Sequence, residues 1–107
     1  MNGAKRPTGG GKTLAEAGGI SELTVDDWRQ IFACRWCHSQ RRILEILHAN
    51  GNQSIIIWSL EKEGISRNAF HGINTNMKKF RLRYRLGKKN RQGYSAHCLF
   101  KMPPESL

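Results

Sequence analysis

The chain has three cysteines, and two of them fall in a segment with recognisable chemistry: Cys34 to His38 reads C-R-W-C-H. This is the C-x-x-C-H spacing through which c-type haem is attached, and Met77 or Met102 could supply an axial ligand. Haem attachment normally follows export, and the N-terminus has no apolar stretch typical of a secretory signal. A haem would also leave the basic C-terminal half without a purpose. We therefore expect no bound cofactor.

The same cysteines could instead bind zinc, with Cys34, Cys37 and Cys98 joined by His38 or His97. Structural zinc sites usually have four ligands, commonly as two close pairs. Only Cys34 and Cys37 make such a pair, because His97 and Cys98 are adjacent and would point to opposite faces of a strand. Zinc is the weaker interpretation. We expect reduced thiols that pack as small side chains.

A Gly-rich stretch near the N-terminus, Gly9 to Thr13, is similar to part of a phosphate-binding loop. The full pattern needs a further Gly where this chain has Arg6, and a preceding strand that residues 1–8 do not offer. We interpret residues 1–19 as a flexible, basic, Gly-rich tail.

No carboxylate is placed to orient a histidine, and no oxyanion-binding feature is visible, so we do not expect an enzyme.

Charge is distributed unevenly along the chain. Residues 1–63 contain eight Lys or Arg and seven Asp or Glu, whereas residues 64–107 contain ten and one. No acid lies between Gly64 and Pro104, and the sequence pI is about 10.2. A basic half of this kind indicates a polyanionic partner, and nucleic acid is the usual one.

The residues best suited to read a nucleic acid lie in a helix expected to begin at Ser66. Phe70, Ile73, Met77 and Phe80 recur at spacings of three and four and predict one buried stripe. Arg suits guanine, Asn suits adenine, and Thr suits either a base edge or a thymine methyl. The side chains expected opposite the stripe, and so to read bases, are Arg67, Asn68, His71, Asn74, Thr75 and Lys78.

A second group of basic residues is better placed to meet phosphates, which position a protein without reading sequence. Two segments of alternating apolar and other residues, 82–86 and 94–100, flank a polar loop with a Gly at each end and predict a β-hairpin. The residues expected to contact the backbone in and before this hairpin are Lys79, Arg81, Arg83, Arg85, Lys88, Lys89 and Arg91.

Other elements must hold these two together. Thr24 is expected to cap a helix that has acids in its first turn and apolar residues spaced by three and four as far as Trp36. The polar run 38–42 is a candidate kink or break, and 43–47 continues the apolar face before a stop at 50–51. Ser54 is expected to cap a short helix that ends at Gly64, although its β-branched start could be a strand.

This order of elements, with Gly64 to Ser66 at the turn and Gly93 to Tyr94 opening the last strand, resembles the winged helix-turn-helix family of DNA-binding domains. The resemblance covers roughly residues 23–100. It implies a mainly α fold with a small β-hairpin, namely three to four helices plus a C-terminal wing. The domains would then be 1–19 tail, 20–102 winged helix and 103–107 tail.

The resemblance implies that the helix beginning at Ser66 lies in a major groove while the wing contacts the DNA backbone. We therefore expect a sequence-specific double-stranded DNA-binding protein, a transcriptional regulator that is cytoplasmic and nucleoid-associated and not membrane-bound. A homodimer is the candidate oligomer. The alternatives are an RNA- or ribosome-associated basic protein and, less favoured, a metal or haem protein using Cys34, Cys37 and His38.

Overall fold

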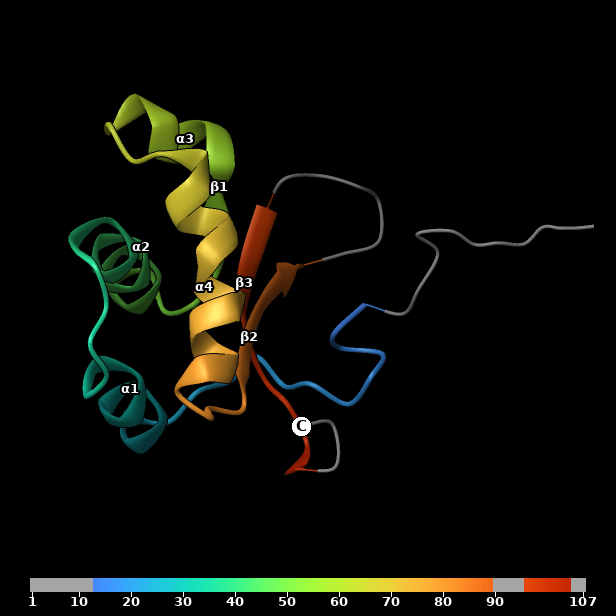
Figure 1. Ribbon diagram of the computed structural model, residues 1–107. Helices are drawn as coiled ribbons and strands as arrows, with labels where there is room; N and C mark the ends of the chain where they lie inside the picture. Colours follow the sequence, from blue (N-terminus) through green and yellow to red (C-terminus); the bar gives the residue numbers. More distant parts are fainter. Residues whose placement is uncertain (1–12, 90–95, 105–107) are drawn as a thin grey trace, which may run out of the picture.

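A three-stranded antiparallel sheet is covered on one side by four helices (Figure 1). The computed structural model describes residues 13–89 and 96–104. Its elements in chain order are α1 (Val25–Phe32), α2 (His38–Ala49), β1 (Ile55–Ile56), α3 (Ile57–Lys62), α4 (Arg67–Lys79), β2 (Tyr84–Lys88) and β3 (Ala96–Lys101). No helix in this described part of the chain is long and apolar enough to cross a membrane.

The first two helices replace one longer helical pattern. Thr24 caps α1, as predicted, and it also forms a full capping box with Asp27. Helix α1 ends with its cap at Ala33, and α2 begins at His38. The break therefore comes before the polar run 38–42, whereas we expected it within that run. Trp36 accounts for this early break. It lies in the non-helical segment between the two helices, its side chain is buried, and its indole N–H donates to the Ile31 carbonyl at 2.8 Å.

The segment after α2 is both strand and helix. Ile55 and Ile56 form β1, which pairs with β3, and α3 then begins at Ile57. Ser54 therefore does not cap this helix, because the strand comes first and Ile56 occupies the cap position. The expected hairpin is present as β2 and β3, and β1 widens it to a sheet with the order β1-β3-β2.

The side chain of Asn52 takes part in the hydrogen bonding of the sheet. Asn52 is buried and lies beside Leu99 in β3, the central strand. Its amide accepts from the Leu99 N–H at 2.9 Å and donates to the Leu99 carbonyl at 2.8 Å. The Asn52 side chain thus pairs with the backbone of Leu99. On one side of Leu99 along β3 lie the residues paired with β1, and on the other lies Lys101, which is bridged to Ile20.

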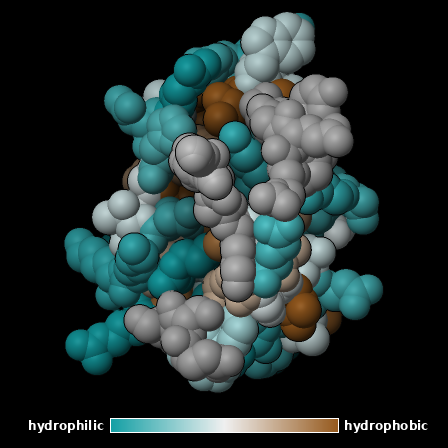
Figure 2. Space-filling model, turned by 90° about the vertical axis from the view of Figure 1, so that its right-hand side faces the viewer, coloured by the Kyte–Doolittle hydropathy of each residue, from teal (hydrophilic) through white to brown (hydrophobic). Residues whose placement is uncertain are grey.

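Both faces of the sheet are covered. Leu99 faces the helices and is fully buried, and Phe100, its neighbour on the opposite face, is 4% exposed. Residues 13–19 cross that opposite face, since a Cβ on Gly19 would meet Phe100 and a Cβ on Gly87 would meet Leu14, and Ile20 then bridges to Lys101 alongside β3. Residues 13–19 thus pack on the sheet, although we expected order to begin near Ile20. Figure 2 views the molecule from this side, where hydrophilic side chains predominate and hydrophobic ones show only as small patches.

Candidate nucleic-acid interface

Helix α4 has one buried and one exposed face. Ser66 caps it, accepting from the Ala69 N–H at 3.2 Å, as predicted. Phe70, Ile73 and Met77 are buried against the rest of the domain. The opposite face is open to solvent, and its exposed predicted base-reading residues are Arg67, Asn68, His71, Thr75 and Lys78. Arg67 forms an exposed ion pair with Glu61 at 3.3 Å.

Asn74 was predicted to read bases, but in the structure its side chain is hydrogen-bonded to the backbone of β2. Its amide donates to the Leu86 carbonyl at 2.8 Å and accepts from the Leu86 N–H at 2.6 Å. Both ends of the side chain are thereby committed to β2, and Asn74 is only half-exposed. Asn74 is therefore not one of the base-reading residues. Its role is to join α4 to the sheet.

Replacing Asn74 by Ala should destabilise the domain by about 2 kcal/mol, because two hydrogen bonds are lost and a backbone donor and acceptor of Leu86 are left without partners. Thermal or denaturant unfolding measures this. Thr75→Ala, one residue along on the exposed face, is the matched control and should change stability by less than about 0.5 kcal/mol. An Asn74→Ala protein of unchanged stability that had lost sequence discrimination would restore Asn74 to the base-reading residues.

Strand β2 packs beside α4. Near the C-terminal end of the helix, Lys78 and Arg85 line the same cavity. In the middle, Asn74 holds Leu86. Near the N-terminal end, Phe70 contacts the ring of His97, the cross-strand partner of Lys88. The C-terminal half of α4 and β2 are therefore neighbours, and Asn74, Lys78 and Arg85 lie where they meet.

The predicted backbone-contacting residues fall into two groups. Lys79, Arg81 and Lys88 are exposed, and their side chains have no polar partner among the residues described. Three others are bound to carbonyls of the domain itself. Lys89 Nζ donates to Gln53 at 2.8 Å, and Arg83 Nε donates to Met102 at 3.0 Å.

Arg85 is the third of these, and its Nη1 donates to the carbonyls of Leu82 and Tyr84, each at 2.7 Å. Burial lowers the pKa of this guanidinium, since its charged form loses hydration. Arg83 and Arg85 are both half-buried, so they are less available to phosphates than predicted. Arg91 lies outside the described residues.

Arg81 has an unusual backbone. It follows α4 with φ of 61°, in the left-handed region, and the Leu82 N–H bonds back to the Met77 carbonyl. This is the helix-ending geometry at which Gly is preferred. A non-glycine residue there costs roughly 1 kcal/mol.

Arg81→Gly should therefore raise stability by roughly 0.5–1 kcal/mol and weaken binding to nucleic acid, because it relieves the backbone and removes an exposed charge. Unfolding and binding are measured on the same preparation. Lys79→Ala is the matched control: it removes an exposed charge from a regular helical position and should weaken binding without the gain in stability. Unchanged binding of Arg81→Gly would exclude Arg81 from the interface.

The cysteines do not converge. Cys34 is half-buried between α1 and α2, Cys37 is exposed at the start of α2, and Cys98 is buried in β3. Within the described ranges, no group of three or more His, Cys, Asp or Glu is arranged to hold a metal ion. Burial raises the pKa of the Cys34 and Cys98 thiols, because their thiolates would lose hydration.

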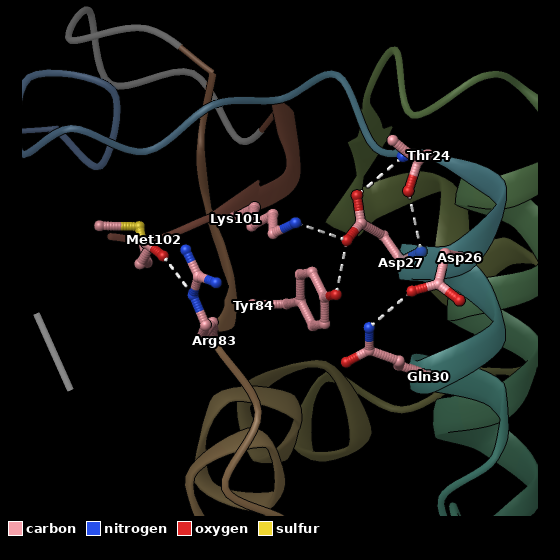
Figure 3. A network of polar contacts seen from close by, with 8 residues as sticks. All are labelled: Thr24, Asp26, Asp27, Gln30, Arg83, Tyr84, Lys101 and Met102. Carbon is pink, nitrogen blue, oxygen red and sulfur yellow. Dashed lines mark hydrogen bonds and ion pairs between the residues drawn. The ribbon is translucent and has the colours of Figure 1, made fainter. Parts of the chain in front are cut away.

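Sequence reasoning missed one buried polar cluster, shown in Figure 3. Asp27 is 2% exposed and accepts from the Thr24 N–H at 2.8 Å, from the Tyr84 hydroxyl at 2.7 Å and from Lys101 Nζ at 2.9 Å. Lys101 is thus a structural cation and no part of the interface. Burial alone would raise the pKa of Asp27, but its hydrogen bonds with Thr24, Lys101 and Tyr84 outweigh burial and hold it well below its usual value.

No family model, no curated protein and no solved structure matches this chain. Function must therefore be argued from its own residues.

Proposed function

We propose that this chain binds double-stranded DNA as a winged helix-turn-helix domain and acts as a transcriptional regulator associated with the nucleoid. The order of elements supports the proposal. Helix α3 ends at Lys62, a tight turn follows with Gly64 at φ of 80°, α4 begins at Arg67, and the β2–β3 hairpin comes last. In that family the helix after the turn lies in the major groove, and the hairpin contacts the DNA backbone.

The observation that carries the proposal is the composition of one surface. The exposed face of α4 adjoins β2 at Lys78 and Arg85, which line one cavity, and no Asp or Glu occurs anywhere from Gly64 to Pro104. Ordinary solvated faces mix both signs of charge. Glu61, which comes from α3, is paired with Arg67 at the start of the helix. A surface with exposed cations and amides but almost no acids suits a phosphate backbone with base edges behind it.

The roles divide by position. Asn68, His71 and Thr75 project from the first two to three turns of α4, the part of such a helix that meets base edges. Lys78, Lys79, Arg81 and Lys88 flank them and would contact phosphates. Arg67 would exchange Glu61 for a base or phosphate on binding, which costs little because the existing ion pair is exposed.

The direct test is selection of bound sequences from a random duplex pool, followed by measurement of affinity for the best sequence. We expect an enriched motif spanning about one major-groove face. A matched measurement on structured RNA at the same salt concentration tests the alternative. Tighter binding to the RNA, with no enriched DNA motif, would overturn the proposal.

Reading and positioning should separate on substitution. Asn68→Ala should cost about 1–3 kcal/mol on the best sequence and little on random DNA, because it removes a base contact. Lys88→Ala should weaken binding to both about equally, because phosphates are the same in every sequence. The quantity to measure is the ratio of specific to non-specific affinity at one salt concentration. If Lys88→Ala collapses this ratio and Asn68→Ala spares it, the roles of helix and hairpin are reversed.

A further inference from the structure

A cavity of about 350 Å³ lies where the C-terminal half of α4 meets β2 and the N-terminal segment. Leu14, Met102 and the β2 backbone at Gly87 supply a mostly apolar lining. Leu14 packs directly on Gly87, where an added Cβ would collide with it, so the N-terminal segment forms one wall of the cavity. The volume falls within the range of about 300–1,000 Å³ typical of small-molecule sites.

The cavity also has two cations and no acid. Lys78 and Arg85 line it, and no Asp or Glu occurs between Gly64 and Pro104. The ammonium group of Lys78 has no polar partner within residues 13–89 and 96–104. Arg85 uses Nη1 on two carbonyls, which leaves its other N–H groups without an acceptor in the same described part.

We propose that this cavity binds a small monocarboxylate with an apolar aliphatic body. The apolar walls would take the body, because removing hydrocarbon from water is favourable. Lys78 and the remaining donors of Arg85 would take the carboxylate, since charge-assisted hydrogen bonds to a carboxylate are among the stronger ones. Inorganic phosphate or acetate would satisfy only the cations, and a neutral hydrocarbon only the walls. The cavity therefore selects for a ligand that carries both features.

The site adjoins the proposed DNA interface through two residues. Asn74, which joins α4 to Leu86, also lines the cavity, and Lys78 stands on the exposed face of the helix. A carboxylate bound here would compete with a DNA phosphate for Lys78. This consequence rests on the proposed function, whereas the binding site itself does not.

The test is an NMR titration of the full chain with octanoate, without DNA, following the methyl resonances of Leu14 and Met102. We expect saturable shifts at these methyl groups with octanoate, and much weaker binding of octylamine, octanol and acetate. Equal binding of octylamine or octanol would overturn the proposal, because the cations would then select nothing. Octanoate shifts absent from both methyl groups would also overturn it.

Two variants locate the head and body of the ligand. Lys78→Met keeps the stem and removes the charge, and should weaken octanoate binding about fivefold; Leu14→Ala removes part of the apolar wall and should also weaken it. Lys79→Met is the matched control, because Lys79 is exposed on the same helix and does not line the cavity. Equal weakening by Lys78→Met and Lys79→Met would mean non-specific charge attraction and would overturn the site. Octanoate binding by a chain that fails to bind DNA would leave the cavity proposal standing and refute the proposed function alone.

Discussion

Asp27→Ala should destabilise the domain by about 3–5 kcal/mol, a large share of the total stability of a chain this small. The carboxylate is 2% exposed and holds Tyr84 and Lys101, which come from different strands. Its removal would leave a buried hydroxyl without an acceptor and a lysine that is 29% exposed without its anion. Equilibrium unfolding in urea measures the loss.

Asp26→Ala is the matched control for this prediction. Asp26 is the preceding residue, its side chain is 70% exposed, and its ion pair with Arg29 spans 3.8 Å. Exposed pairs of this kind contribute about 0–1 kcal/mol, so the control should remain close to the native chain. Similar losses in the two variants would show that the effect belongs to the helix start and not to the buried cluster.

The same cluster should make stability fall at acid pH. The pKa of Asp27 in the folded chain lies below its ordinary value of 3.8, so this group stabilises the fold above that value. The contribution is lost as the pH falls from there towards the folded pKa, because the unfolded chain takes up the proton first. Asp27→Asn should flatten this part of the stability profile. An unchanged profile would mean that another carboxylate is responsible.

DNA affinity should fall steeply with salt. The four exposed cations proposed to meet phosphates, Lys78, Lys79, Arg81 and Lys88, predict a slope of log affinity against log salt near −3.6, at about −0.9 for each contact. Between 50 and 200 mM salt this slope corresponds to roughly a 150-fold loss of affinity. Fluorescence anisotropy across that range, with one duplex throughout, measures it.

Removing one of these cations gives the control. Lys79→Ala should reduce the slope by about 0.9, whereas Arg29→Ala, a cation on α1 with an acidic partner, should leave it unchanged. Affinity that stays flat with salt would refute the nucleic-acid interpretation as a whole. A steep slope unaltered by Lys79→Ala would instead place the phosphates on other residues.

Local patterns predicted the elements that local chemistry controls. Thr24 and Ser66 were recognised as helix caps because each side chain bonds to a backbone N–H only three residues ahead. The buried stripe of α4 follows from spacing alone, and the hairpin from alternation around a polar loop. The break before α2 was misplaced because Trp36 continues the helical spacing but reaches the core from a loop.

The polar contacts were harder to predict, because several of them join residues that are far apart in the sequence. Asn74 has the position and type of a base-reading residue, and only its bonds to Leu86, 12 residues later, assign it to the fold. Tyr84 and Asp27 meet across 57 residues, so neither a short motif nor a periodicity could pair them. The position of a polar residue on a helix face predicts that it is exposed, but it does not predict whether its side chain is hydrogen-bonded within the domain.

The two asparagine amides also bear on how this chain meets other copies of itself. Leu86 and Leu99 are cross-strand partners, and their outward-facing backbone groups end on Asn74 and Asn52. An open edge strand is a template for strand addition and aggregation. At Leu86 an incoming strand would first have to displace both bonds from Asn74. The amide therefore protects the edge of β2 against strand addition at its middle residue.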